Sequence, residues 1–583
     1  MTKKKLELMS KKGLFKRSMP YIKKYKGFVF LTLLLSIIVS VLSALTPFIT
    51  KNILDEYLPK SDYDTIIKML ILYGVIIVLT FVFRYLFNYI NTLTGMKIEK
   101  LVREDAIRKI DHLPVDYFSL EPDGKIVAKI TSDTAGVRAF YTTLFTIINA
   151  LLNITIVYVG VLLIEPVLGL LVLVLVPILL LWVTVYRRFV HKFYVDLRET
   201  GSKITGKLNE LITGTLIIQD FNQENYMLED YNTLVRRYVR NDRITSNINN
   251  FLGWELLSLI KRTAEILLLI YLGFSSINIA GAVIGIGLIA ALSENLDKMI
   301  NPVNAIFNNL NELEDSLVGA TRAYALIDEA DDTKIFDGEE APEVNGDIEF
   351  KNVSFAYVDD KYVLNDVNLH VEAGKTVGIV GHTGSGKSSM MNLILGYNDA
   401  QKGQILIDGV DMTTYNKASL RKNMGIVLQT PALFAGTLKS NITLERDYSD
   451  EEVLKVLEAV GAKYMVEKTP EGLNQVINYR GENLSLGEKQ LISFARILLR
   501  NPKILVLDEA TANIDTKTEK KIKEAMDIIA KGRTTFIIAH RLSTIKNADE
   551  IIVLDKGNLV GKGSHEYLYE NCMEYKKIYD SQK

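Results

Sequence analysis

A glycine-rich loop, Gly381–Ser388, is the clearest chemical feature of this 583-residue chain and reads Gly-His-Thr-Gly-Ser-Gly-Lys-Ser. The apolar run Val377–Val380 before it predicts a buried strand, and a helix is predicted over Ser389–Leu395. In this context glycines let backbone N–H groups curl around phosphate oxygens, and the helix N-terminus adds a favourable dipole. We expect Lys387 to reach the β- and γ-phosphates of a nucleotide and the Ser388 hydroxyl to bind Mg²⁺. The residues predicted to hold the nucleotide here are Gly381, His382, Thr383, Gly384, Ser385, Gly386, Lys387, Ser388 and Ser389.

Two carboxylates close a second apolar strand, where Ile504–Leu507 is followed directly by Asp508 and Glu509. Carboxylate oxygens are ligands that Mg²⁺ prefers, and holding the magnesium shell is the role expected of Asp508. Glu509 is placed beside it to orient or deprotonate an attacking water molecule. Together with the phosphate loop, this pair predicts nucleotide hydrolysis.

The segment Leu484–Gln490 lies between these motifs and reads Leu-Ser-Leu-Gly-Glu-Lys-Gln. The phosphate loop, this segment and the carboxylate pair, in this order, resemble the nucleotide-binding domain of the ATP-binding cassette (ABC) transporters. In that family the middle segment usually reads Leu-Ser-Gly-Gly-Gln and serves the ATP bound by a partner domain. The resemblance implies that Ser485 and Gly487 donate to the γ-phosphate of that ATP. Leu486 and Glu488 depart from the family pattern.

The resemblance implies roles for four further residues of this cassette. His540, after the strand pattern Thr534–Ile538, matches the switch histidine that contacts the γ-phosphate. Gln429 matches the glutamine that reaches Mg²⁺ and water, and Tyr357 matches the aromatic residue that stacks on adenine. Asp515 matches the aspartate of the loop through which two cassettes communicate. The implied cofactors are ATP and Mg²⁺, with Ser388, Gln429 and Asp508 as magnesium ligands.

Long apolar runs dominate the first half of the chain. About 20 apolar residues span a bilayer as a helix, so each run predicts one crossing. The predicted fold class is multi-domain: a six-helix α transmembrane domain with long cytoplasmic extensions, followed by an α/β P-loop NTPase domain of the ABC type. The runs are residues 27–49, 66–91, 143–164 and 167–186, with weaker, partly charged runs at 252–276 and 278–310.

Acidic, turn-rich residues mark a linker between the two halves of the chain. Asp328–Asp332 and Gly338–Pro342 are of this kind, and a strand-like alternation begins at Ile348. The predicted domains are a transmembrane domain over 1–325, a linker over 326–346 and a nucleotide-binding domain over 347–583.

Segments 96–142 and 187–250 are too long for simple turns and have helical periodicity, which predicts membrane helices that continue into the cytosol. In the resembling exporters, each extension turns through a short helix that touches a nucleotide domain. The matching stretches here are His112–Leu120 and Gly214–Asn225. The alternative is that their apolar residues lie on the surface of a helical hairpin. The expected contact residues are Val115, Phe118, Ile217 and Phe221.

Positive charges predict the orientation of the membrane helices. Residues 1–26 contain ten Lys or Arg residues, and the segments 96–142 and 187–250 are also basic. Lys and Arg accumulate on the cytoplasmic side, so both termini are expected in the cytoplasm. The N-terminus shows no convincing signal peptide or organelle presequence, which favours a multi-pass protein of a bacterial plasma membrane. The net charge of −1 gives no indication of nucleic-acid binding.

Cysteine and histidine usage excludes other kinds of site. Cys572 is the only cysteine, so no disulfide within the chain is possible, and zinc sites built from several cysteines are excluded. The six histidines lack metal-ligand spacing, and no transition metal is expected.

The altered segment Leu484–Gln490 beside an intact phosphate loop predicts two unequal ATP sites. The partner is then an unlike half-transporter with a standard signature motif. The ATP on this chain's own loop is expected to be the hydrolysed one, and the other ATP to turn over slowly. A side chain at Leu486 is expected to loosen the phosphate contact. The alternative is that Leu486 points away and costs little.

Charged residues in the last two helical segments bear on what is carried. Such residues at membrane depth are expensive and usually face a cavity or a partner. Lys261 and Glu265 are one turn apart and are expected to neutralise one another. Acidic groups in an apolar cavity suit amphipathic cations. The charged residues are Glu255, Lys261, Arg262, Glu265, Glu294, Asp297 and Lys298.

These features make ATP-driven export of hydrophobic or cationic small molecules, of the multidrug type, the leading hypothesis, with membrane lipid as surroundings. An alternative for the charged residues of the last two helical segments is that they lie in cytosolic helix extensions and do not contact the cargo. A second is a peptide or lipid exporter of the same architecture, in homodimeric form. A third is an ATP-gated channel or sensor, which would not require the hydrolytic pair of Glu509 and His540.

Replacing Glu509 by Gln tests the hydrolytic assignment. The isosteric amide cannot accept a proton from water, so we predict loss of ATPase activity by two orders of magnitude or more, in line with about 10²–10⁴-fold for general-base catalysis. Phosphate release by the wild type and the variant, each co-expressed with its native partner, measures this. Full activity in the variant would contradict the assignment.

Overall fold

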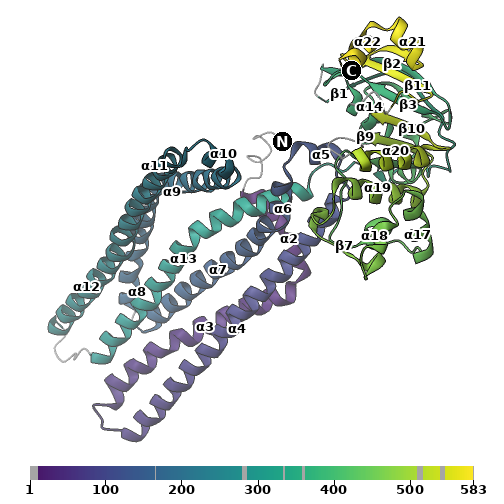
Figure 1. The fold of residues 1–583 in the computed structure, drawn as a ribbon. Coiled ribbons are helices and arrows are strands. Elements are labelled where there is room, and N and C mark those ends of the chain that lie inside the picture. The colour runs from purple at the N-terminus through teal and green to yellow at the C-terminus, as the bar shows by residue number, and fades with distance from the viewer. Residues whose placement is uncertain are drawn as a thin grey trace. The chain divides into compact units, whose positions relative to one another are not determined.

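The computed structural model describes residues 11–164, 166–278, 285–332, 335–357, 361–508, 516–538 and 545–581. The chain forms two compact units. The first consists of Met1–Lys109 and Gly124–Glu329, and the second of Ile110–Asp123 and Ala330–Lys583. Figure 1 shows the first as a set of long helices and the second as a mixed arrangement of strands and helices.

The described residues of the first unit form helices joined by short turns. Three stretches are long and apolar enough to cross a membrane within the described part of the chain: Lys26–Tyr57, Tyr63–Ile110 and Asp123–Leu163. The helices are α2 (Lys11–Lys24), α3 (Lys26–Asn52), α4 (Tyr63–Ile110), α6 (Asp123–Ile130), α7 (Ser132–Ile164), α8 (Pro166–Leu173), α9 (Leu175–Thr213), α10 (Thr215–Asp220), α11 (Glu224–Ile248), α12 (Leu256–Asn278) and α13 (Ile286–Ile327), with π-helical turns η1 (Ile53–Tyr57) and η2 (Asn249–Glu255).

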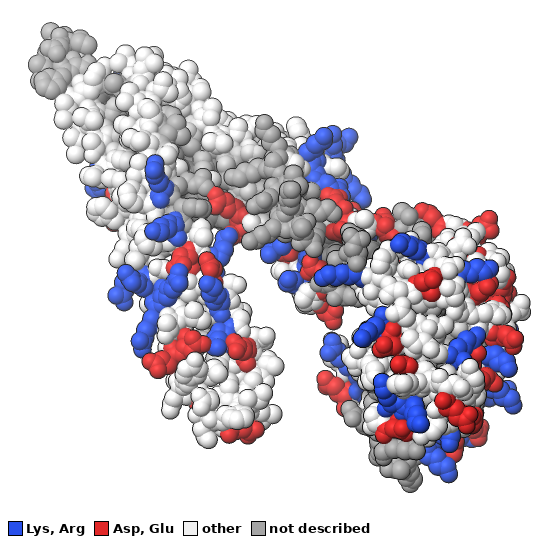
Figure 2. Space-filling model, turned by 90° about the horizontal axis from the view of Figure 1, so that it is seen from above, with Lys and Arg blue, Asp and Glu red and all other residues white. Residues whose placement is uncertain are grey.

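The length of α4 confirms that a membrane helix continues beyond the bilayer. It has 48 residues, about 72 Å at 1.5 Å per residue, whereas the hydrocarbon core is about 30 Å thick. Only 6% of its most apolar stretch is buried within the chain, so its exposed Ile, Leu and Phe side chains are available to lipid or to a partner. In Figure 2 the helices of the first unit present broad areas without charge, whereas charges of both signs are interspersed over the second unit.

Small residues bring α7 and α13 into close contact. A Cβ placed on Gly136 of α7 would lie 3.1 Å from the Cα of Gly319 on α13 and 3.3 Å from the nitrogen of Ala320. Ala320, Ala323 and Tyr324 are fully buried around this crossing. Small residues permit such close helix approach in membrane proteins, where dispersion contacts drive helix association.

The second unit contains a mixed six-stranded sheet. Its order is β12-β11-β3-β10-β9-β6, in which β11, β3, β10, β9 and β6 are parallel neighbours and β12 is antiparallel. A four-stranded antiparallel sheet, β2-β1-β4-β5, forms a second layer. The strands are β1 (Ile348–Ala356), β2 (Tyr362–Val371), β3 (Thr376–Val380), β4 (Lys402–Ile407), β5 (Val410–Asp411), β6 (Met424–Val427), β9 (Ile504–Asp508), β10 (Thr534–Ile538), β11 (Glu550–Asp555) and β12 (Asn558–Gly563), with the pair β7 (Gly436–Thr437) and β8 (Val476–Ile477) apart.

The parallel strands are buried on both faces. In β9, Leu505 and Leu507 join a core that includes residues of α19 (Leu486–Arg500) and α20 (Thr516–Ala530). The alternate residues Ile504 and Val506 join the opposite core, with α14 (Lys387–Ile394) and the antiparallel sheet. Side chains of a strand alternate between faces, so a strand covered on both sides reads as a continuous apolar run. The remaining helices are α15 (Lys417–Leu420), α16 (Leu438–Thr443), α17 (Asp450–Ala459), α18 (Tyr464–Glu467), α21 (His565–Asn571) and α22 (Met573–Asp580).

Short helices occupy both stretches predicted to contact a nucleotide domain. α5 (Val115–Leu120) follows His112, whose carbonyl accepts a hydrogen bond of 2.9 Å from the backbone N–H of Asp332. The ring of His112 lies 5.0 Å from that of Phe336. On α10, Ile217 is 65% exposed, and the neighbouring Phe221 is 71% exposed. These exposed apolar residues of α10 have the character expected of a docking helix.

Substituting Gly136 by Ala tests the α7–α13 crossing. The added methyl meets backbone atoms that cannot rotate away, and overpacking typically costs about 1–3 kcal/mol, so we predict a lower apparent melting temperature in detergent. Gly206→Ala on α9 is the matched control, because a Cβ there meets nothing within 4 Å. Both changes gain the same helix propensity, and equal melting temperatures would contradict the packing argument.

Candidate functional site

The carboxyl ends of the central parallel strands meet at one edge of the six-stranded sheet. Ile538 of β10 is paired with Asp508 of β9 on one side and with Ile379 of β3 on the other. Val427 of β6 is paired with Leu507 of β9. The phosphate loop, Asp508 and the segment after β6 therefore leave the sheet at the same level, which is where ligands bind in open α/β sheets.

Three of the predicted residues, Glu509, Asp515 and His540, lie outside the described residues. In the chain, Glu509 directly follows Asp508, and His540 comes two residues after Ile538. Asp508 is half-buried at the end of β9. The roles of these three residues stay predictions.

The phosphate loop connects β3 to α14 through a left-handed glycine. Gly386 has φ +104° and caps the first turn of the helix. A side chain there would also meet Leu364 at 2.7 Å and the carbonyl oxygen of Val363 at 3.0 Å. The helix begins at Lys387, two residues before the predicted start at Ser389. An apolar pattern shows that a helix is present but does not fix its first residue. Here the left-handed conformation of Gly386 sets the start of the helix at Lys387.

The loop has the shape and the polar groups that a phosphate requires. A Cβ on Gly381 would lie 2.3 Å from both the carbonyl oxygen of Leu554 and the Oγ of Ser385, so only glycine fits. The Oγ of Ser385 is buried without a hydrogen-bond partner in the described part of the chain. The Lys387 ammonium donates to the carbonyl oxygens of Gly381 (2.7 Å) and His382 (3.0 Å). A tight backbone, an orphaned hydroxyl and a buried lysine fit a nucleotide phosphate. His382, Thr383, Gly384 and Ser388 are exposed, whereas Ser389 is buried.

Tyr357 lies beside this loop at the end of β1. Its Oη is within hydrogen-bonding distance of the Ser389 hydroxyl (3.3 Å) and of the Asn392 amide (3.2 Å), both on α14. Phe355 contacts the ring edge-to-face at 4.8 Å between centroids. Tyr357 remains 51% exposed, so an anchored aromatic ring is available for a planar base.

Gln490, to which the sequence analysis assigned no role, connects the segment Leu484–Gln490 to the backbone of Gln429 through a hydrogen bond. Gln490 of α19 is 1% exposed, and its amide donates to the carbonyl oxygens of Leu428 (3.2 Å) and Gln429 (3.0 Å). Arg496, further along α19, donates to the carbonyl oxygen of Ala432 at 2.7 Å. Burial lowers the pKa of Arg496 to about 10, so its guanidinium stays protonated at neutral pH. α19 is thus attached at two points to the segment after β6.

Ser485 caps α19 in a reciprocal arrangement. Its Oγ accepts a hydrogen bond of 3.2 Å from the backbone N–H of Glu488, and its own N–H donates to the Glu488 carboxylate at 2.9 Å. Gly487, in the first turn, is buried. The spacing Ser-x-x-Glu is a sequence signal for such a capping box.

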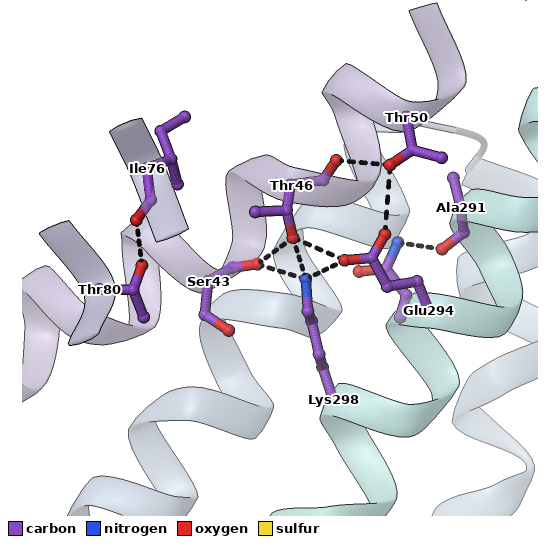
Figure 3. Close-up of polar contacts among 9 residues, drawn as sticks. Ser43, Thr46, Thr50, Ile76, Thr80, Ala291, Glu294 and Lys298 are labelled. Atoms are coloured by element: carbon purple, nitrogen blue, oxygen red, sulfur yellow. Dashed lines mark hydrogen bonds and ion pairs between the residues drawn. The ribbon is translucent and has the colours of Figure 1, made fainter. Parts of the chain in front are cut away.

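A second candidate site lies among the membrane helices, where α3 and α13 share a polar cluster (Figure 3). The Lys298 ammonium lies 2.6 Å from the Glu294 carboxylate and 2.7 Å from the carbonyl oxygen of Ser43, and it also contacts Thr46. Thr46 and Thr50 donate to the same carboxylate, at 2.6 and 3.4 Å. The charges of Glu294 and Lys298 therefore cancel inside one network, as charges among apolar helices require.

A different face of α13 carries a cluster with excess negative charge. Lys261 of α12 pairs with Glu265 at 3.6 Å, as predicted, and also with Asp297 of α13. Glu265 accepts a hydrogen bond of 3.1 Å from Ser293. Glu265 and Ser293 line a small cavity of about 140 Å³ whose other walls are aliphatic. One lysine stands against two carboxylates, which leaves a net charge of −1 beside an apolar cavity. The aliphatic walls are Leu268, Leu269, Ile289, Leu292 and Leu296.

Comparison with known proteins agrees with this geometry. Residues 29–283 match the ABC transporter transmembrane region, and residues 364–512 match the ABC transporter domain. The chain belongs to the ABC transporter family, with the membrane region and the nucleotide-binding domain in one polypeptide, as in a half-transporter. It is a multi-pass membrane protein that binds ATP and couples ATP hydrolysis to transport.

Particular relatives place the chain among exporters. A Bacillus subtilis (strain 168) protein described as "Probable multidrug resistance ABC transporter ATP-binding/permease protein" is 39% identical over 89% of this chain and 77% of that protein. An ATP-dependent lipid A-core flippase of Haemophilus influenzae (strain 86-028NP) is 30% identical over 97% of each chain. The solved structure of a bacterial Atm1-family ABC exporter with ATP bound has a TM-score of 0.79 and 25% identity, over 96% of this chain and 98% of that one.

Replacing Tyr357 by Ala tests the proposed base contact. Loss of a stacked base is worth about 1–3 kcal/mol, so we predict ATP binding roughly 5- to 150-fold weaker. Tyr357→Phe is the matched control, because it keeps the ring and removes only the hydroxyl. Titration of the purified transporter with a fluorescent ATP analogue measures both, and equal affinities in Tyr357→Ala and wild type would refute stacking.

Proposed function

We propose that this chain is one half of an exporter that expels amphipathic and hydrophobic compounds across a bacterial plasma membrane at the expense of ATP. The observation that carries the proposal is the fusion of long apolar helices to a sheet edge where the phosphate loop and Asp508 converge. ABC exporters work as dimers, so a second half-transporter completes the assembly.

In the proposed mechanism the cassette holds ATP at its own phosphate loop. Lys387 neutralises the β- and γ-phosphates, and Tyr357 supports the adenine. Mg²⁺ supplies charge neutralisation at the phosphates when bound, and oxygen ligands from Ser388, Gln429 and Asp508 suit that ion. Glu509 is the proposed base for water and His540 the proposed γ-phosphate contact.

A cationic or amphipathic cargo is supported by the charges on α12 and α13. The Lys261, Glu265 and Asp297 cluster has one excess negative charge, and the cavity beside it is lined mainly by Leu and Ile. Relatives named for multidrug resistance point the same way. A lipid flippase is the second candidate, because one relative is named as a lipid A-core flippase.

An unlike partner is supported by the departures at Leu486 and Glu488 from the family's signature. This chain then supplies the hydrolytic groups of one ATP site and the altered lid of the other. With both termini in the cytoplasm, the basic N-terminal segment faces the inner leaflet.

Transport by the assembly purified with its native partner tests the proposed cargo. We predict ATP-dependent movement of a fluorescent lipophilic monocation into inverted vesicles, reduced about fivefold or more by Glu265→Gln, because a charge contact at 4 Å is worth about 1–4 kcal/mol. Glu312→Gln is the control, because it makes the same charge change at an exposed position of α13 that does not line the cavity beside Glu265 of α12.

Other results would decide against this function. Movement of labelled lipid without movement of the cation would favour the flippase, and ATP hydrolysis without transport of either would contradict export. Subunit analysis of the same preparation shows whether two unlike chains or two copies are present.

A further inference from the structure

The start of α19, which is proposed to cover the partner's ATP, differs from an ordinary anion-binding helix end. The helix begins at Leu486, and Ser485 and Glu488 form the capping box. A helix N-terminus attracts anions because its first N–H groups are unpaired and its dipole is positive there. In this chain a carboxylate of the same segment already lies at that point.

The Glu488 side chain is held in place rather than extended into solvent. Its Oε2 accepts from the Ser485 N–H at 2.9 Å, and the side chain is 16% exposed. The Lys468 ammonium approaches the other carboxylate oxygen only to 4.0 Å, and its side chain is 72% exposed. Such an exposed, distant ion pair neutralises little charge, because water and salt screen it. The ion pair with Lys468 therefore does little to offset the carboxylate at the helix start.

Leu486 has a different status. It occupies the first helical position of α19, and its backbone φ is negative. The backbone there needs no glycine, and the Leu side chain is half-buried. The departure at this position thus imposes no unusual backbone conformation on the segment.

We propose that Glu488 is the residue that determines how weakly this segment binds the ATP held by the partner. Its carboxylate takes the Ser485 N–H from an incoming γ-phosphate and repels that phosphate's charge, whereas Leu486 contributes little. The inference rests on the proposed function, in which this segment covers the partner's ATP. Glutamine, the usual family residue here, also completes a capping box but carries no charge.

Glu488→Gln isolates the charge, because the amide has the same shape and still caps α19. MgATP titration of the complete transporter, purified with its partner in lipid nanodiscs, is the measurement. Placing like charges in contact costs several kcal/mol, so we expect at least about tenfold tighter binding at the sites that contain Glu488→Gln. The gain should shrink as salt rises, because screening weakens the repulsion already present in the wild type.

Two further variants keep the test decisive. Leu486→Gly should leave the affinity within twofold of wild type, and Glu488→Ala should also tighten binding, since it removes the charge without depending on the amide. Unchanged affinity in both Glu488 variants, or tightening in Leu486→Gly alone, would overturn the inference.

The number of ATP sites whose MgATP affinity changes in Glu488→Gln distinguishes this inference from the proposed function. One shifted site of two indicates an unlike partner, and two shifted sites indicate a homodimer. A homodimer would contradict the proposed asymmetry and leave the assignment of Glu488 intact.

Discussion

The parallel register of β3, β10, β9 and β6 is the constraint on which the nucleotide site depends. It sets Ile379, Ile538 and Asp508 side by side, so that segments more than a hundred residues apart leave the sheet at one edge. Alternate residues of these strands pack into two different cores, so a slip of one residue would move each side chain into the core that it does not fit. The phosphate loop and Asp508, the proposed magnesium ligand, are thus positioned by apolar residues buried in other parts of the sheet.

A different constraint governs the membrane unit. Charges among apolar helices must be paired, since neither lipid nor dry protein solvates them. Glu294 and Lys298 cancel within a network of hydroxyl groups from α3, whereas Lys261 faces two carboxylates. The Glu294–Lys298 cluster connects α3 to α13 and is neutral, whereas the Lys261, Glu265 and Asp297 cluster has a net charge of −1. This difference is why the proposed cargo contact lies between α12 and α13.

α19 connects the remaining parts of the nucleotide-binding unit. Its first turn holds the Glu488 carboxylate, Gln490 holds the backbone of Gln429, and Arg496 holds that of Ala432. A displacement of the segment after β6 would therefore bear directly on the start of α19. The same helix buries its apolar side against β9 and α20, so packing as well as these hydrogen bonds holds it against the central sheet.

Much of this protein is determined by local sequence. Periodicity and motif spacing predicted the apolar helices, the strands before the phosphate loop and at Asp508, and the ion pair one turn apart, because each depends on neighbours in the chain. Four features were not predicted. They are the helix start at Lys387, the partners of Gln490, the close contact of Gly136 with Gly319, and the hydrogen bond from the Ser485 N–H to the Glu488 carboxylate. Three of these four depend on backbone conformation or on residues distant in sequence. The Ser485–Glu488 spacing was readable, but only the folded chain decided that the carboxylate occupies the helix start, because capping is settled by side-chain geometry.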